Sequence, residues 1–122
     1  MPPMVSRFAR FLVLALVLLV PSARAGDGFV EGFEDLPLAP GLLSVPEAGI
    51  GFDKPTGRIV VAYARGAVTR SAVEGFYNAT LPQLGWIAES GGSSYLREDE
   101  RLTIEVLGPD GALTVRYSLA PI

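Results

Sequence analysis

The 122-residue sequence contains no cysteine and no histidine. A chain without cysteine has neither disulfides nor a thiolate nucleophile, and a chain without histidine lacks the commonest general base. The two residues are also the usual ligands of zinc and other transition metals. These absences argue against most hydrolases and metalloenzymes, and we predict neither a metal site nor another cofactor.

Lysine is almost absent as well, since Lys54 stands against nine arginines. A serine nucleophile would need a lysine as its base, but Lys54 begins a Lys-Pro-Thr-Gly stretch that is typical of a solvated turn. Paired carboxylates could hydrolyse a glycoside, but the Glu-Asp-Glu stretch of residues 98–100 lies at the tip of a predicted hairpin. Neither this stretch nor the acidic residues within 27–35 have the spacing of a calcium-binding EF-hand. We therefore predict no catalytic residues and a protein that is not an enzyme.

The first 25 residues have the pattern of an export signal. Arg7 and Arg10 precede an unbroken apolar run over residues 11–20, and Ala23-Arg-Ala25 supplies the small residues of a cleavage site. Such a run forms only ~15 Å of helix, about half of what a bilayer core requires, which disfavours a retained membrane anchor. We predict a cleaved signal peptide over residues 1–25 and a periplasmic or secreted protein without stable membrane insertion.

The expected mature chain is acidic. Cleavage after Ala25 would remove three of the ten basic residues and none of the 13 acidic ones, so that the net charge moves from −3 to −6. Scattered arginines on an acidic protein favour neither nucleic acid nor an anionic membrane as a partner. We therefore predict no binding to nucleic acid.

Residues 69–86 contain the clearest helix signal of the expected mature chain. Thr69 is a candidate N-cap, and Ser71 with Glu74 has the form of a capping box, so the helix could begin at either position. Apolar residues recur with helical spacing and predict one buried stripe. This stripe consists of Val73, Phe76, Thr80 and Leu84, with Tyr77 and Leu81 beside it.

The end of this helix is marked by Pro82 and Gly85. Proline cannot donate to the carbonyl four residues earlier, so we expect a kinked or loosened last turn. Gly85 suits the left-handed residue of a Schellman C-cap, which would place Trp86 against Leu81.

Four aromatic residues are open to two interpretations. Phe76 and Tyr77 lie on the predicted helix, Trp86 follows it, and Tyr117 lies in the last predicted strand. Large aromatic side chains most often fill the core. The same four side chains could instead line an apolar pocket between the helix and a sheet.

The remaining sequence alternates between apolar runs and turn signals. Two strands are predicted before the helix, over residues 50–53 and 58–65, and the second is apolar on both faces, which indicates a central strand. Four more follow the helix, over residues 86–89, 95–97, 102–106 and 113–119. We predict an α+β domain over residues 49–122, in which one amphipathic helix packs on an antiparallel sheet as a two-layer sandwich of order ββαββββ.

Residues 26–48 combine apolar residues, prolines and acids without a helical or strand period. They are too apolar for an idle linker, and two interpretations stay open. The segment either lies extended across the domain and fills an open face or edge, or it is a docking peptide for a partner protein. The centre of such a peptide would be Phe33, Glu34, Asp35, Leu36 and Leu38.

Three motifs follow one another along the expected mature chain. They are Phe-Glu-Asp-Leu-Pro-Leu at residues 33–38, Phe-Asp-Lys-Pro-Thr-Gly-Arg-Ile at 52–59 and Phe-Tyr-x3-Leu-Pro-x-Leu-Gly-Trp at 76–86. In this order they resemble a group of short exported proteins of proteobacterial genomes that have no assigned function. The last motif is the distinctive one, and the resemblance brings no catalytic residues with it.

Two functions fit these observations. The first is a non-enzymatic periplasmic protein that binds another envelope protein, through residues 26–48 or through an exposed face of the sheet. The second is a carrier of a small apolar ligand, with the four aromatic residues lining its pocket. One helix over one sheet leaves little room for an enclosed cavity of ~300 Å³ or more, which favours the first function.

Overall fold

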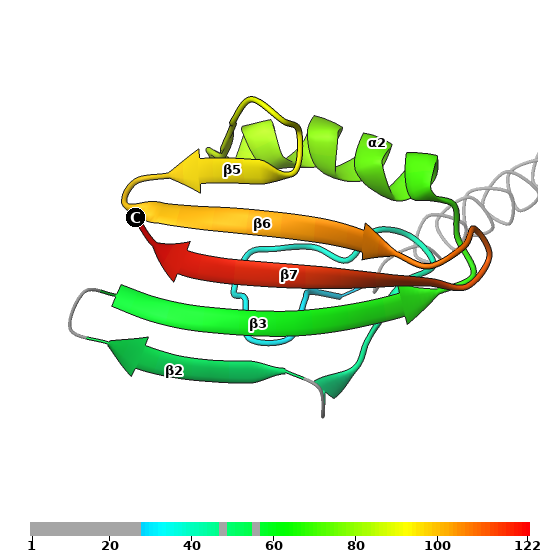
Figure 1. Ribbon diagram of the computed structural model, residues 1–122, viewed down its shortest axis with the longest axis horizontal. Helices are drawn as coiled ribbons and strands as arrows, with labels where there is room; N and C mark the ends of the chain where they lie inside the picture. Colours follow the sequence, from blue (N-terminus) through cyan, green and yellow to red (C-terminus); the bar gives the residue numbers. More distant parts are fainter. Residues whose placement is uncertain (1–27, 47–48, 55–56) are drawn as a thin grey trace, which may run out of the picture.

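The computed structural model describes residues 28–46, 49–54 and 57–122, so the predicted signal peptide lies outside the described residues. The described residues form one antiparallel sheet and one α-helix, which confirms the predicted α+β fold (Figure 1). In these ranges no helix is both long and apolar enough to span a membrane. In chain order the elements are β1 (Leu43–Ser44), β2 (Ile50–Lys54), β3 (Gly57–Gly66), α2 (Arg70–Thr80), the 3-10 helix η3 (Leu81–Leu84), β4 (Ile87–Ala88), β5 (Ser94–Arg97), β6 (Glu100–Leu107) and β7 (Leu113–Pro121).

The sheet has seven strands in the order β1-β3-β7-β6-β5-β4, with β2 also paired to β3. Because β7 occupies one side of β3, strands β1 and β2 follow one another along its other side. The predicted order ββαββββ is confirmed by β2 and β3, α2, and β4 to β7. The two-residue strand β1 is additional, because it is too short to show a period of two in the sequence.

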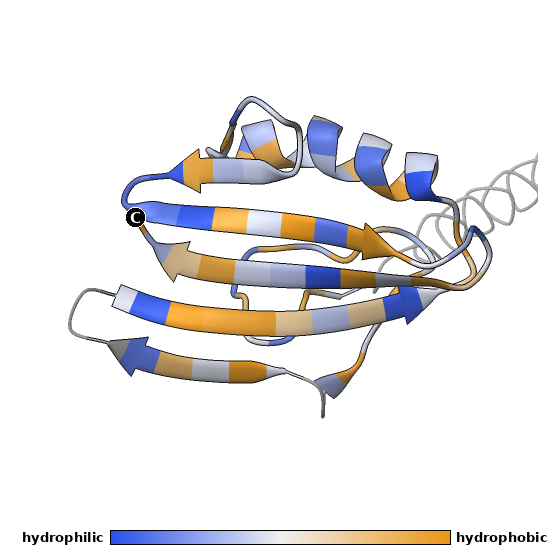
Figure 2. Cartoon of the chain, viewed as in Figure 1, coloured by the Kyte–Doolittle hydropathy of each residue, from blue (hydrophilic) through white to orange (hydrophobic). Residues whose placement is uncertain are grey.

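One face of the sheet, the covered face, lies under α2 and under the N-terminal segment, which we define as residues 28–42 (Figure 1). Strands β6 and β7 alternate between apolar and polar residues along their length, whereas β3 carries a continuous apolar run (Figure 2). The apolar residues of the covered face fall into register across the three strands. Large side chains on β7 and β6 stand beside alanines on β3, and these leave room for the segment. The rows are Val60 with Leu119 and Leu102, Ala62 with Tyr117 and Ile104, and Ala64 with Val115 and Val106.

The helix begins as one of the two alternatives predicted. The Ala72 N–H donates to Thr69 Oγ1 over 3.2 Å, so Thr69 is the N-cap. The predicted stripe was slightly wrong, because the fully buried residues are Val73, Tyr77 and Leu81. These follow the i, i+4, i+8 spacing, and the helix is therefore rotated so that the predicted stripe members Phe76, Thr80 and Leu84 lie at its half-buried margin.

The helix ends as its sequence predicts. The α-helix stops at Thr80 and continues as η3, with Pro82 in the first turn of the 3-10 helix. Gly85 has a φ of 92°, its N–H donates to the Pro82 carbonyl, and the Trp86 N–H donates to the Leu81 carbonyl over 3.0 Å. This is a Schellman arrangement, and it directs the chain from the helix into the sheet.

Candidate functional site

The structure places the predicted docking residues of the N-terminal segment in two environments. Phe33, Leu36 and Leu38 are buried in the core, with exposed fractions of 7%, 2% and 5%. Glu34 and Asp35 face solvent. The segment thus lies across the covered face, as the first of its two interpretations has it, and the three apolar side chains are not accessible to a partner in this conformation.

A pair of tyrosine hydroxyls fastens the segment. The Tyr77 hydroxyl donates to the Pro37 carbonyl oxygen over 2.8 Å and accepts from the Ala39 N–H over 3.2 Å. The Tyr117 hydroxyl lies 2.8 Å from that of Tyr77. Since the one proton of Tyr77 goes to Pro37, Tyr117 is the donor in this pair. Helix, sheet and N-terminal segment are therefore joined at one point.

The environment of the two tyrosines suits structure better than catalysis. Burial raises the pKa of Tyr77 to about 12. Burial, followed by the neighbouring Tyr77, also raises the pKa of Tyr117 far above its ordinary value. Both hydroxyls stay protonated near neutral pH, so neither is suited to accept a proton from a substrate there.

The four aromatic residues proposed for a pocket pack against one another or against the chain. The Tyr77 ring meets Phe76 edge-on with centroids 5.0 Å apart and meets Tyr117 edge-on at 5.8 Å. Trp86 is covered by the guanidinium of Arg97, 4.2 Å from the ring centroid. Tyr77, Trp86 and Tyr117 belong to the buried core, and Phe76 lies half-buried against it.

The acidic stretch at residues 98–100 is spread over a hairpin tip. Glu98 and Asp99 are exposed, whereas Glu100 begins β6 and pairs with Arg58 over 3.4 Å. Across the ranges that the structure describes, no group of three acidic side chains is placed to hold a metal ion.

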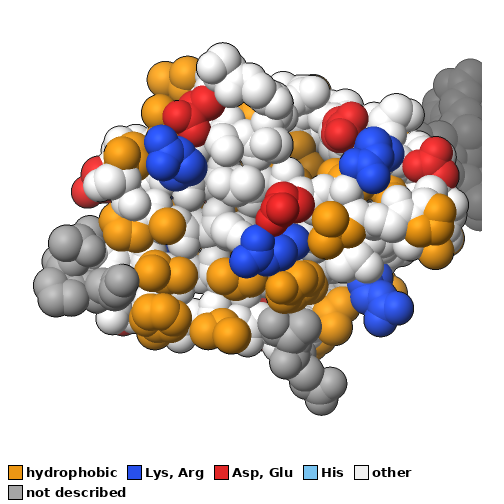
Figure 3. Space-filling model, in the orientation of Figure 1, with side chains coloured by type: hydrophobic (Ala, Val, Ile, Leu, Met, Phe, Trp, Pro, Cys, Tyr) orange, Lys and Arg blue, Asp and Glu red, His pale blue; other side chains and the backbone are white. Residues whose placement is uncertain are grey.

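The second face of the sheet, the open face, has a polar half and an apolar half (Figure 3). On the polar half Arg116 binds Glu105 over 2.6 Å, next to hydroxyl-bearing residues of β5, β6 and β7. On the apolar half, the register of β2 with β3 places Ile50 opposite Val61 and Phe52 opposite Ile59. We call this half, with the neighbouring Tyr63, the apolar patch.

The apolar patch is exposed. Ile50 and Phe52 show 62% and 52% of their surface to solvent, and no element of the described ranges lies over them. β2 also has no strand on its outer side among the described elements, so its backbone forms an open edge. Because both faces of β3 are apolar, the sequence predicts a central strand, and β3 does have neighbours on both sides. Its second apolar face, however, is not covered and belongs to this patch.

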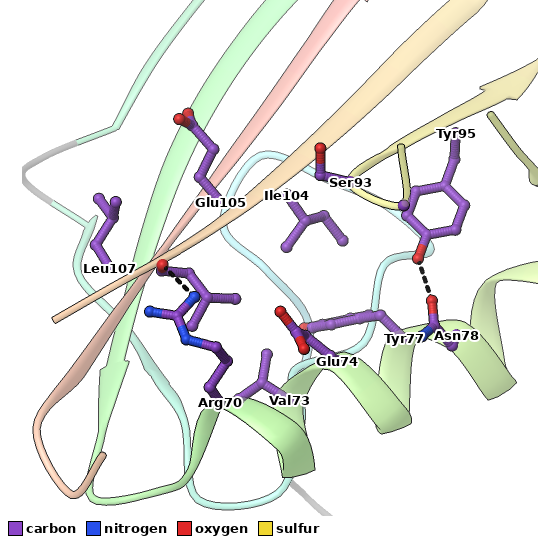
Figure 4. A pocket seen from close by; sticks show the side chains of 12 residues that line it. Arg70, Val73, Glu74, Tyr77, Asn78, Ser93, Tyr95, Ile104, Glu105 and Leu107 are labelled. Atoms are coloured by element: carbon purple, nitrogen blue, oxygen red, sulfur yellow. Dashed lines mark hydrogen bonds between the residues drawn. The ribbon is translucent and has the colours of Figure 1, made fainter. Parts of the chain in front are cut away.

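A cleft of about 290 Å³ opens between α2 and the β5–β6 hairpin (Figure 4). It exists because β5 is shorter than β6: Ser94 pairs with Thr103, and residues 104–107 have no strand on that side. Val73 of the helix and Ile104 of β6 form its apolar floor. Of the four aromatic residues, only Tyr77 borders it.

Polar side chains stand around this cleft. Arg70 donates from Nη1 to the Val106 carbonyl over 2.8 Å, which satisfies one acceptor on the unpaired edge of β6. Tyr95 donates to Asn78 Oδ1 over 2.8 Å on the other side (Figure 4). Glu74 lies between them, and its carboxylate points toward β6 (Figure 4). The pKa of Tyr95 is raised by its burial and by the negative charge of Glu74.

These helical residues have a regular spacing in the sequence that is separate from the apolar stripe. Arg70, Glu74 and Asn78 repeat at i, i+4 and i+8 and therefore share one flank of the helix. This flank lies directly beside the buried stripe. Tyr95 is brought to them by the sheet register, which the sequence does not specify.

Comparison with known proteins adds no further assignment. No family model matches the chain, and neither the curated proteins nor the solved structures yield a match.

Proposed function

We propose that the protein is a non-enzymatic binding domain of the bacterial cell envelope and that another protein docks on its apolar patch. The observation that carries this proposal is the exposure of Ile50 and Phe52 beside Ile59 and Val61 on the open face. Full burial of such a side chain is worth roughly 1.5–3 kcal/mol. This free energy is not gained while the side chains are exposed, and a partner that covers the patch supplies the burial. Binding of a partner is the usual reason for an exposed apolar area of this kind.

The open edge of β2 supports a partner with an extended segment. An edge strand presents unpaired N–H and C=O groups, to which a further strand can add. If this partner segment has apolar residues at alternate positions, its apolar side chains would extend the patch beyond β2. Arg65, exposed at the β1 end of the same face, favours an acidic residue near one end of that segment.

The envelope location rests on residues 1–25, whose basic, apolar and small-residue parts have the order of an export signal. The resemblance to short exported proteins agrees with it. The alternative function, a carrier of an apolar ligand among Phe76, Tyr77, Trp86 and Tyr117, has less support because these rings pack on each other or under Arg97.

Affinity capture with matched variants tests the proposal. The exported protein would be immobilised and incubated with envelope extract of its native host, in the wild-type form and as an Ile50→Thr/Phe52→Thr variant. The control variant is Ile87→Thr/Leu107→Thr, which removes two exposed apolar side chains from the same face outside the patch. Both variants place threonine, which suits strands, at exposed positions and should lose little stability.

We expect one protein to be retained by the wild type and by the control, with at least tenfold weaker retention on the patch variant. Equal retention by the patch variant would contradict the proposal. Sedimentation analysis tests whether a second copy of the chain occupies the patch instead. If the wild type is a dimer and the patch variant is a monomer, the patch serves self-association, which would contradict an envelope partner.

A further inference from the structure

The cleft between α2 and β6 differs from the apolar patch in place and in chemistry. It lies on the helix side of the sheet, and its occupant goes beyond the protein partner proposed above. Its volume of about 290 Å³ is at the lower limit of ligand pockets, which restricts it to small molecules.

Three charged residues line the cleft. Glu105 pairs with Arg116, whereas the positive Arg70 and the negative Glu74 do not neutralise each other. Arg70 and Glu74 are neighbours at i and i+4, yet they form no ion pair within 4.0 Å among the described residues. Arg70 is instead turned to the Val106 carbonyl by Nη1, and its other N–H groups stay available for an anion. The Glu74 carboxylate reaches into the cleft toward β6 (Figure 4).

Between these two charges lies an apolar surface. Ile104 keeps 8% of its surface exposed and is the part of the apolar floor that a ligand can reach, whereas Val73, 1% exposed, contributes almost no surface. Beyond Glu74, the Asn78 amide oxygen accepts from the Tyr95 hydroxyl.

From this arrangement we infer that the cleft binds a small zwitterion with an apolar body, of the free amino acid class. Its ammonium group pairs with Glu74, its carboxylate pairs with Arg70, and its side chain rests on Ile104. A simple amine would leave Arg70 without a counter-charge, and a simple carboxylate would leave Glu74 without one. The zwitterion satisfies both.

Three isosteric ligands test this on the unmodified protein. L-Leucine has both charged groups, isoamylamine lacks the carboxylate, and isocaproate lacks the ammonium group. We expect leucine to shift the backbone amide NMR signals of Val73, Glu74 and Ile104, and to bind roughly tenfold more tightly than either analogue. The inference is overturned if an analogue binds as tightly as leucine, or if no ligand of the three shifts these signals at millimolar concentration.

Charge-removing variants provide the second test. Glu74→Gln and Arg70→Gln should each weaken leucine binding roughly tenfold. Glu98→Gln and Arg65→Gln make the same charge changes at exposed positions outside the cleft and should leave binding unchanged. Leucine binding that survives Glu74→Gln would place the ligand elsewhere and defeat the inference. Neither of these two tests involves the apolar patch, so their results are independent of the capture experiment.

Discussion

The N-terminal segment and strand β2 are two apolar stretches that follow one another in the chain, and the structure treats them in opposite ways. Phe33 and Leu36 are buried on the covered face, whereas Ile50 and Phe52 are exposed on the open face. The segment has no regular hydrogen-bonded ladder, and the Tyr77 hydroxyl of the helix satisfies part of its backbone. β2 has a ladder on one side only. Apolar content alone therefore does not distinguish a stretch that completes the core from one that is offered to a partner.

The largest expected effect comes from truncating a buried leucine of the N-terminal segment, with an exposed leucine of the neighbouring strand β1 as the control. Leu36→Ala should lower the free energy of unfolding by about 2–5 kcal/mol, because it opens a cavity in the core. Leu43→Ala, at a position that is 73% exposed, should change it by less than about 0.5 kcal/mol. Urea unfolding followed by circular dichroism measures both. Similar costs for the two variants would mean that the segment is not part of the core in solution.

The next effect concerns the hydroxyl group that fastens the segment. Tyr77→Phe leaves the Pro37 carbonyl and the Ala39 N–H without their partner, and we expect a loss of about 1–3 kcal/mol in unfolding free energy. Tyr117→Phe removes only a donor to Tyr77 and should cost less. The same urea experiment ranks the two variants. The reverse order would show that the segment depends on Tyr117, contrary to the hydrogen bonds described.

Alkaline pH tests the same point without a mutation. The pKa of Tyr77 is raised in the folded protein from its ordinary value of 10.0 to about 12, so the folded state favours the protonated hydroxyl. Its contribution to stability is complete below pH 10 and is lost as the pH rises toward 12, and Tyr117 contributes in the same direction. For Tyr77 the loss between pH 10 and 11 is about 1 kcal/mol. A Tyr77→Phe/Tyr117→Phe variant should show a flatter dependence in urea unfolding over this range. A wild-type protein whose stability does not fall there would contradict the burial of both hydroxyls.

The fold could be predicted from the sequence where the deciding contacts are local. The N-cap at Thr69 and the Schellman end at Gly85 depend on residues within one turn. The sequence predicts the end directly and offers Thr69 as one of two possible starts. The longer strands were predicted from their alternation and from the turn residues between them. The buried stripe was less accurate, because the choice between Phe76 and Tyr77 depends on the hydroxyl partners that only the folded N-terminal segment supplies.

The candidate sites could be predicted only in part, because they depend on which face of the sheet is covered. Alternation on β3 shows two apolar faces, but it does not indicate that the N-terminal segment lies over Ala62 and leaves Val61 on the open face. The cleft likewise follows from the unequal lengths of β5 and β6. Its helical side chains, Arg70 and Glu74, could have been selected from their spacing, but the floor opposite them could not.

The smallest expected effect concerns the ion pair at the outer side of the N-terminal segment. Arg97 donates to Asp35 over 2.7 Å, and the hydrogen bond with Arg97 lowers the pKa of Asp35 below its ordinary value of 3.8. Its contribution is present above that value and is lost as the pH falls below it. Because half of the Asp35 side chain is exposed, we expect Asp35→Asn to cost only about 0.2–1 kcal/mol at pH 7, less at high salt. Glu34→Gln, on the exposed neighbour, is the matched control and should cost nothing measurable. A cost for Asp35→Asn as large as that for Leu36→Ala would mean that charge rather than burial holds the segment on the covered face, and the contrast with β2 would then need a different explanation.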